Sequence, residues 1–208
     1  MLNIVLVSGH YPNNVYFAEC TRQLLYEYAM IHNYGFYYND MEIIEKNTGS
    51  LHYSRCPALV KASHLYPDAD WFVWFDSDVI VNPSQKYNKI ELFIDLSDKN
   101  ILYHVFHEKP WSFPINTGVK IVNKKAIGYE AQMWNIRNTP PWNEFPFEQK
   151  ALIEYIIPQL HTNLYIIHDP YMLNCIYRLY PTKIENALFI HMCAMNTKER
   201  NNIIKKYL

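Results

Sequence analysis

The hydrophobic residues of this 208-residue chain form short runs that alternate with longer amphipathic segments. The runs are rich in β-branched and aromatic residues and end at polar or glycine-containing stretches, which is typical of buried strands. We expect strands at residues 3–7, 35–38, 71–75, 101–106, 118–122, 164–167 and 187–191. Runs that are apolar throughout indicate a sheet that is covered on both faces.

The amphipathic segments repeat their apolar residues at steps of three and four, which is the period of a helical face. The clearest of them carries Phe17, Thr21, Leu24, Tyr28 and Ile31 on one side. We expect helices at residues 15–32, 57–65, 125–136 and 147–157. Because strands and helices alternate along the chain, the pattern predicts a single α/β domain with a mostly parallel, mixed central sheet flanked by helices.

One apolar run is interrupted by charge, in the segment DADWFVWFDSDVIVNP at residues 68–83. Asp76 ends the run and Asp78 follows two residues later, so in an extended chain both carboxylates would face the same side. Two neighbouring carboxylates repel unless a cation or hydrogen bonds compensate them. Oxygen ligands of this kind suit Mg²⁺ or Mn²⁺, which often complete their shells with substrate phosphates. The pair therefore predicts a metal diphosphate site, and the plainer alternative is a strand end followed by a capped turn.

Two further stretches end predicted strands. Ligands of open α/β sheets bind at the carboxyl ends of strands, so we expect Ser8 and Gly9 to lie near the Asp76 and Asp78 pair, together with His191. A neutral imidazole is a reasonable metal ligand. A satisfied core histidine is the alternative for His191.

Composition and charge limit the kinds of partner and compartment that we expect for this chain. Half of the residues are hydrophobic and the formal net charge is −1, so a nucleic-acid partner attracted by bulk charge is not expected. The four cysteines lie far apart without a C-x-x-C pair, which argues against a zinc ribbon or a disulfide framework and favours a reducing compartment. The first apolar run is too short for a membrane span and lacks a basic region for secretion. We expect a soluble cytoplasmic protein, and further domains of a longer polypeptide are compatible with this.

The segment RCPALVKASHLYPDADWFVWFDSDVIVNP at residues 55–83 resembles the signature of the galactosyl- and xylosyltransferases of fungi and plants, a retaining GT-A glycosyltransferase family. Similar blocks follow in the family's order: YEYAMIHNYGFYYN at 26–39, WSFPINTGVKIVNK at 111–124, FEQKALIEYI at 147–156 and HMC at 191–193. The resemblance covers most of residues 26–193 and is strongest at the D-S-D block. The chain departs from it at Glu148, where the family usually has Asp, and after His191, where the family's Gly is missing.

The resemblance implies a Rossmann-like GT-A domain over residues 1–208. Its nucleotide-binding part would span about 1–83, its sugar and acceptor part about 84–193, and its C-terminal tail 194–208. It implies a metal-dependent, retaining glycosyltransferase that uses Mn²⁺ or Mg²⁺ and moves a hexose, pentose or deoxyhexose from a UDP-sugar to a glycan acceptor. The donor sugar and the acceptor stay open.

The resemblance also implies a role for each motif. Asp76 and Asp78 would hold the metal or the ribose, and His191 would be a further metal ligand. Glu148 and Gln149 would lie beside the reacting anomeric carbon. The other candidates are Ser8, Gly9, His10, Tyr11 and Ser77 for the nucleotide, Arg55, Lys61 and Lys198 for the diphosphate, and Asn116, Thr117 and Gly118 for the sugar and acceptor. Ordinary turns and solvated cations are the alternatives, and the helix dipole favours a carboxylate such as Glu148 whatever its function.

Sugar transfer breaks the anomeric C–O bond while negative charge grows on the leaving phosphate, which a divalent ion and Arg or Lys stabilise. For a retaining reaction Glu148 is the one candidate nucleophile, and front-face substitution with the departing phosphate as base is the preferred hypothesis. The loops around Trp111 and Trp142 are candidates to stack on acceptor sugars or to cover the core.

Two other classes compete with this interpretation. A phosphatase of the haloacid dehalogenase type would place its D-x-D on the first strand and an acidic pair later, whereas here a whole βαβ unit precedes Asp76 and no Asp-Asp pair occurs. A sugar-binding module that keeps nucleotide affinity without turnover is equally compatible with the sequence.

Overall fold

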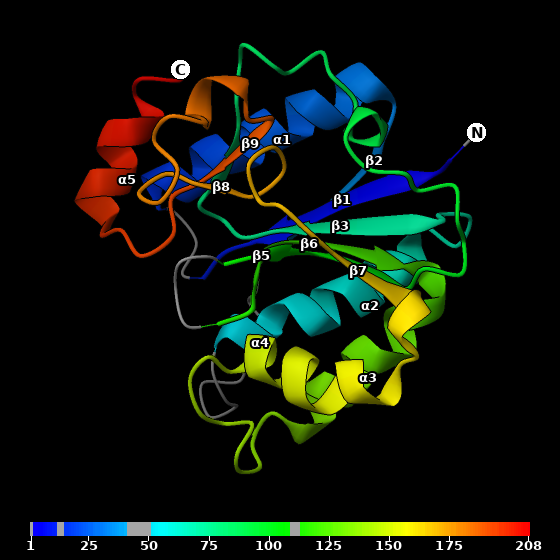
Figure 1. Ribbon diagram of the computed structural model, residues 1–208. Helices are drawn as coiled ribbons and strands as arrows, with labels where there is room; N and C mark the ends of the chain where they lie inside the picture. The colour runs from blue at the N-terminus through cyan, green and yellow to red at the C-terminus, as the bar shows by residue number, and fades with distance from the viewer. Residues whose placement is uncertain (1, 12–14, 41–50, 109–112) are drawn as a thin grey trace.

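The computed structural model describes residues 2–11, 15–40, 51–108 and 113–208 and has a six-stranded central sheet (Figure 1). The strand order is β2-β1-β3-β6-β5-β7. The strands are β1 (Ile4–Gly9), β2 (Gly35–Asn39), β3 (Trp71–Phe75), β5 (Tyr103–His107), β6 (Ile115–Asn123) and β7 (Tyr165–His168). β6 is antiparallel to both of its neighbours and the other pairs are parallel, so the predicted mixed, mostly parallel sheet is confirmed.

The central strand β3 explains why the sheet is covered on both faces. All five of its side chains are at most 2% exposed. The pleat directs Trp71, Val73 and Phe75 into one core and Phe72 and Trp74 into the other. A strand that is apolar throughout can therefore bury every side chain only between two layers.

Helices supply these two layers. α1 (Tyr16–His32) packs Leu25, Tyr28 and Ala29 on one face of the sheet, and α2 (Arg55–Leu65) packs Ala58 and Leu59 on the other. α3 (Ile127–Ile136) and α4 (Glu148–Ala151) lie on the same side as α2, below the sheet in Figure 1. α2 begins two residues before the predicted residue 57, and the helical run that starts with α4 continues as a π-helical turn (Leu152–Ile156) and a 3-10 turn (Ile157–Gln159). Further 3-10 turns are Leu51–Ser54, Ile90–Leu92, Lys124–Ala126, Thr162–Leu164 and Ile184–Asn186.

A second, three-stranded sheet was not expected from the sequence. Its order is β4-β9-β8, from β4 (Val79–Val81), β8 (Cys175–Ile176) and β9 (Phe189–His191). The strand predicted at residues 187–191 thus belongs to this small sheet. Its register places Val79 opposite His191, and Met192 N donates to Asp78 O over 2.9 Å. This pairing brings the end of the chain next to the D-S-D segment.

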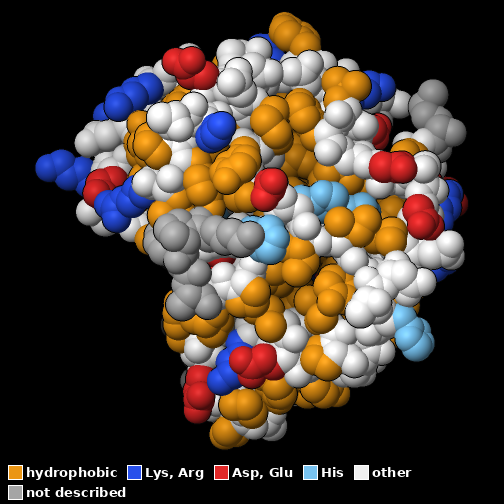
Figure 2. Space-filling view, viewed as in Figure 1, with side chains coloured by type: hydrophobic (Ala, Val, Ile, Leu, Met, Phe, Trp, Pro, Cys, Tyr) orange, Lys and Arg blue, Asp and Glu red, His pale blue; other side chains and the backbone are white. Residues whose placement is uncertain are grey.

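Residues 194–208, expected as a tail, contain the helix α5 (Thr197–Ile204). Its first turn is closed by a capping box, in which Asn196 Oδ1 accepts from Glu199 N and Glu199 Oε2 accepts from Asn196 N. Figure 2 shows Lys and Arg side chains gathered at this end of the molecule.

All four cysteines are unpaired. Among the helices of the described residues, none has the length and apolar character needed to cross a membrane.

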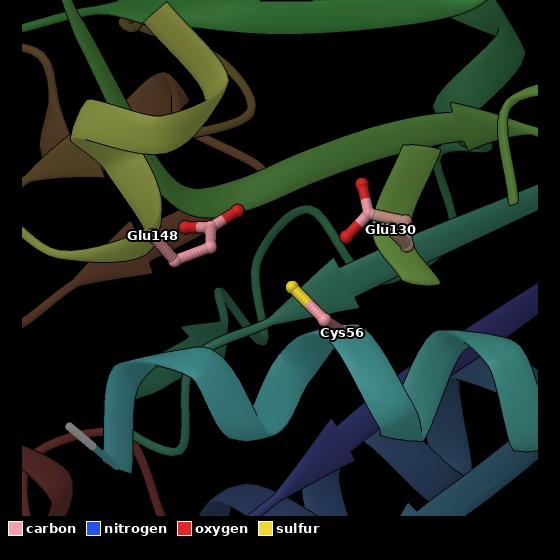
Figure 3. A group of neighbouring side chains, drawn as sticks. All are labelled: Cys56, Glu130 and Glu148. Carbon is pink, nitrogen blue, oxygen red and sulfur yellow. The ribbon is translucent and has the colours of Figure 1, made fainter. Parts of the chain in front are cut away.

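A buried ionic cluster lies between the sheet and the α2–α4 layer. Lys120 of β6, Glu130 of α3 and Glu148 of α4 are 0% exposed. The Lys120 ammonium lies 3.0 Å from both carboxylate oxygens of Glu130 and 2.5 Å from Glu148 Oε1. Figure 3 shows that Glu130 and Glu148 point toward one another, with Cys56 of α2 beside them, and potential ligand atoms of these three lie within 4.8 Å of one another. The spacing would suit a metal ion, but the ammonium of Lys120 already forms ion pairs with both carboxylates.

The cluster also sets the charge of Glu148. Burial alone would raise the pKa of Glu148, but Lys120 and Arg55 outweigh burial and lower it. Burial raises the pKa of Glu130 despite Lys120. Of the two carboxyls, Glu148 is therefore the more firmly ionised.

Replacing Lys120 with Met should lower the free energy of unfolding by about 3–5 kcal/mol, because two buried carboxylates lose their shared cation. Urea denaturation of wild type and variant measures the change. Lys125→Met, at an exposed position just after the same strand, should stay within about 0.5 kcal/mol of wild type. A Lys120→Met loss no larger than that of the control would contradict this account of the cluster.

Candidate active site

The D-S-D segment is a turn. Val79 N donates to Asp76 O over 3.0 Å, so the expectation that Asp76 and Asp78 lie in an extended chain is wrong. The turn nevertheless brings the two carboxylates together, because it lies between β3 and β4 and both side chains face the same hollow. Carboxylate oxygens of Asp76 and Asp78 and a ring nitrogen of His191 lie within 4.8 Å of one another.

His191 reaches this position because Gly118 has no side chain. A Cβ atom on Gly118 would lie 2.0 Å from His191 Cε1 and 2.6 Å from Nδ1, so the imidazole lies directly against the Gly118 backbone. The Gly118 carbonyl also accepts from Asp76 N over 2.7 Å. Gly118, expected to leave room for the sugar or acceptor, leaves room for the imidazole and also lines the larger of the two cavities described below.

Two arginines compensate the two carboxylates. Arg55 lies 3.0 Å from Asp76 Oδ1, and Arg200 of α5 lies 2.6 Å from Asp78 Oδ2. Burial would raise the pKa of Asp78, but His191 and Arg200 outweigh burial and lower it to about 2. Asp76 also accepts from Trp74 Nε1 over 2.7 Å.

Of the three cations named from the sequence, only Arg55 lies at the carboxylates. Lys198 is exposed on α5 and lines neither of the two cavities described below, whereas Arg200, two residues later, reaches Asp78. Lys61 lies over the ring of Tyr37, 5.8 Å from its centroid, and is absent from both linings as well.

Arg55, the first residue of α2, is 4% exposed and connects the D-S-D turn to the buried cluster. Its NH1 group donates to Thr117 O over 2.8 Å and to Thr117 Oγ1 over 2.6 Å, and lies 3.3 Å from Glu148 Oε2. Thr117 Oγ1 donates in turn to Glu148 Oε2 over 3.0 Å. The Thr117 hydroxyl, expected to bind a sugar, thus donates its proton within the protein and accepts one of the two hydrogen bonds it can accept, and Thr117 lines the larger of the two cavities described below.

Glu148 and Gln149 differ in their surroundings. Both oxygens of Glu148 are held, one by Lys120 and one by Thr117 and Arg55. Gln149 Oε1 accepts from Thr117 N over 3.2 Å, and its Nε2 donates to Glu108 Oε2 over 3.2 Å.

Glu108 is a further carboxyl group at this site, just past the end of β5. It is 5% exposed and accepts from Asn116 Nδ2 over 2.8 Å and from Gln149 Nε2. Burial raises its pKa, and the two amide hydrogen bonds only partly offset this. Unlike Glu148, Glu108 has no Lys or Arg partner within the described residues.

Two cavities meet at these side chains. One of about 260 Å³ is lined on one side by Gly9, His10, Tyr11 and Ser77. The other, of about 530 Å³, is lined on one side by Glu108, Asn116, Glu148, Gln149 and Phe145. Both cavities are lined by His52, Arg55, Asp76, Asp78 and Arg200. The predicted carboxylate pair thus lies where the two cavities join.

Other predicted residues lie away from the cavities. Ser8 is fully buried in β1 and lines neither of them, and its hydroxyl has no hydrogen-bond partner in the described part of the chain. Trp142 packs against the α2–α4 side of the core and its ring lies 5.5 Å from that of Tyr155. Trp111 lies outside the described residues.

Three residues at this site, Glu108, Arg200 and Asn174, were not predicted from the sequence. Asn174 is buried and contacts His191. Glu108 is the first acidic residue after a predicted strand, so the rule that ligands bind at the carboxyl ends of strands could have found it. Arg200 lies in a polar stretch that opens with the capping pattern N-x-x-E, a signal for a helix at this place. Asn174 lies six residues beyond the end of β7 and matches no motif, so no sequence signal marks it.

Known proteins resemble this structure and sequence. A crystal structure of a glycosyltransferase involved in the glycosylation of the major capsid of PBCV-1 is 47% identical, with 98% of this chain and 99% of that chain covered and a TM-score of 0.94. The apo form of the glycosyltransferase GlyE from Streptococcus pneumoniae TIGR4 (13% identity, TM-score 0.59) and an active-site mutant of LgtC (12% identity, TM-score 0.53) share the fold. These matches cover 100% and 99% of this chain, and 60% and 96% of the respective neighbours.

No curated protein sequence matches the chain. The sequence model of the galactosyl transferase GMA12/MNN10 family matches residues 3–135, which include the D-S-D turn, Arg55 and the strand that carries Thr117 and Gly118. This match extends over more than half of the chain. The chain therefore belongs to the galactosyl transferase GMA12/MNN10 family and is a glycosyltransferase with a GT-A fold.

Proposed function

We propose that this enzyme is metal-dependent and transfers a hexose, pentose or deoxyhexose from a UDP-sugar to a glycan acceptor with retention of configuration. The observation that carries the proposal is the convergence of Asp76, Asp78 and His191 at the junction of the two cavities. One cavity would hold the nucleotide and the other the sugar and acceptor, so the diphosphate would lie between them.

The side chains present fit a divalent cation. Asp76, Asp78 and His191 would hold Mn²⁺ or Mg²⁺, and the ion would neutralise negative charge on the diphosphate leaving group. Gly118 leaves the space in which the imidazole lies. Arg55 and Arg200 add positive charge at the same place, and guanidinium groups bind phosphate oxygens well.

The smaller cavity fits a nucleoside. Gly9 lets the ligand approach the backbone closely, and the ring of Tyr11, 40% exposed, is free to stack on a base. His10 Nδ1 lies 2.7 Å from Ser77 Oγ, which links the end of β1 to the D-S-D turn. Ser8 is buried next to Gly9 in β1 and would support this side of the smaller cavity without touching the nucleotide.

The carboxyl groups that line the larger cavity indicate which mechanism is possible. Glu148 is ion-paired through both oxygens and 0% exposed, so it lacks the free, accessible oxygen that a nucleophile needs. This supports front-face substitution with the departing phosphate as base, and makes Glu148 a residue that positions Arg55. Glu108 has unused acceptor capacity and would accept a hydrogen bond from a sugar hydroxyl.

The 47% identity to the capsid glycosyltransferase supports a proposal about the source, acceptor and location of this enzyme. We infer a chlorella virus source, a glycan of the viral capsid as acceptor, and the host cytoplasm as location. In that setting the domain could belong to a longer polypeptide.

Wild type should bind UDP tightly only when Mn²⁺ is present, because the ion would link the carboxylates of Asp76 and Asp78 to the diphosphate. Asp78→Ala should lower UDP affinity in Mn²⁺ by at least about 10-fold, as measured by isothermal titration. Asp68→Ala removes an exposed carboxylate elsewhere and should match wild type. UDP binding that ignores both Mn²⁺ and Asp78 would refute the metal diphosphate site.

Gly118→Ala should also abolish Mn²⁺-dependent UDP binding, because the new methyl group must displace the His191 ring. Gly128→Ala is the matched control, since a Cβ there meets no atom within 4 Å. Isothermal titration of UDP into both variants with and without Mn²⁺ measures the effect, and thermal melts confirm that both variants are folded. A folded Gly118→Ala protein with wild-type metal dependence would exclude His191 as a ligand.

Glu108→Gln should lower kcat/KM for sugar transfer by roughly 10- to 100-fold, the size of one charged hydrogen bond. UDP affinity should not change, because Glu108 does not line the nucleotide cavity. Steady-state kinetics with UDP-sugars, beside Glu154→Gln at an exposed position, provide the measurement. Unchanged kinetics would remove Glu108 from the sugar site.

A further inference from the structure

We propose that Asn174 is a positioning residue that keeps a proton on Nδ1 of His191, so that Nε2 is the ring nitrogen that a bound cation would meet beside Asp76 and Asp78. Asn174 lies in the loop between β7 and β8 and is 0% exposed. The inference rests on the proposed function, because the Nε2 lone pair matters for a bound cation. It concerns which imidazole nitrogen is available to that cation.

The first step fixes the orientation of Asn116. Gly118 N lies 2.9 Å from Asn116 Oδ1. A backbone N–H can only donate, so the atom facing it must be the amide oxygen. Asn116 Nδ2 consequently faces Glu108, whose carboxylate accepts from it over 2.8 Å.

The second step fixes the orientation of Asn174. Its Nδ2 lies 3.1 Å from Asn116 Oδ1 and 3.4 Å from the backbone oxygen of Asn116. Both partners are acceptors, so the amide NH₂ of Asn174 must face them. The remaining amide oxygen, Asn174 Oδ1, then faces His191 Nδ1 over 3.0 Å.

The third step assigns the proton. A carbonyl oxygen only accepts, so His191 Nδ1 carries a hydrogen and donates it to Asn174. A backbone N–H thus determines, through two asparagines, which ring nitrogen is protonated. The Nε2 atom is left on the side of Asp78, 3.3 Å from its Oδ1.

Asn174 acts against a competing arrangement. Asp78 is itself an acceptor, and without Asn174 it would favour a neutral ring with the proton on Nε2, where the lone pair needed for a cation is lost. Water cannot replace Asn174 easily, because His191 is 2% exposed and Asn174 is fully buried. A hydrogen bond to the second ring nitrogen also raises the basicity of a ligating imidazole.

Two substitutions separate this role from packing. Asn174→Leu keeps the approximate shape and removes the acceptor, so Mn²⁺-dependent UDP affinity should fall roughly 10- to 100-fold. Asn174→Asp keeps an oxygen toward Nδ1 but places its second oxygen against the acceptors of Asn116, so it should lose clearly less affinity than Asn174→Leu. Asn82→Leu is the matched control, because Asn82 is also a buried asparagine whose amide donates to three backbone carbonyls, but it lies outside both cavity linings.

A second readout follows the proton itself. Nitrogen-15 NMR of the protein loaded with Mg²⁺ and UDP should show a protonated, hydrogen-bonded His191 Nδ1 in wild type and in Asn82→Leu. In Asn174→Leu, at concentrations that saturate the site, the Nδ1 proton should lose the hydrogen-bond shift and exchange faster with solvent.

The outcomes are distinct. If wild type binds no Mn²⁺ with UDP, the proposed metal site falls and this inference falls with it. If wild type binds but folded Asn174→Leu binds equally well, or if Asn174→Asp loses as much affinity as Asn174→Leu, the inference alone is overturned and the metal site stands.

Discussion

The structure depends on compensating buried charge. Asp76, Arg55, Glu148, Lys120 and Glu130 form a continuous series in which carboxylates and cations alternate, with successive contacts of 3.0, 3.3, 2.5 and 3.0 Å. Buried ions are costly unless each is paired and hydrogen-bonded, so this series constrains α2, α3, α4 and β6 to one relative arrangement. Only Asp76, at the outer end, is substantially exposed, with 26% of its side chain accessible. The series therefore connects the carboxylate of Asp76, at the site, to ion pairs in the buried interior.

The same constraint separates the roles of the site's carboxyl groups. Asp76 and Asp78 line both cavities and each pairs with one arginine, whereas Glu148 is 0% exposed and ion-paired with both Lys120 and Arg55. Glu108 is held by two amides and has no Lys or Arg partner among the described residues, so it is the carboxyl group best suited to a neutral hydroxyl. Membership of a glycosyltransferase family excludes the phosphatase interpretation of the D-S-D motif. That motif serves different chemistry in different folds, and its neighbours decide which.

Local patterns predicted most of the fold. The run at residues 71–75 is apolar throughout and forms the central strand, because only a strand covered on both faces can bury all of its side chains. The helix at residues 15–32 was equally clear, since its apolar residues recur on one side. Predictions were wrong or missing where long-range contacts overrule local preference. The segment at residues 76–79 turns, and β4 and β8 are short strands that exist only because β9 pairs with both.

The covered α/β sheet and the place of the adjacent carboxylates follow from local patterns, because periodicity and neighbouring residues are local properties of the chain. The tertiary structure decided which distant residues join them. His191 lies opposite Val79 through strand register, Arg200 arrives on a helix at the chain's end, and Gly118 is glycine because an imidazole lies against it. These contacts depend on how separate elements pack, and no spacing within a single segment encodes that packing.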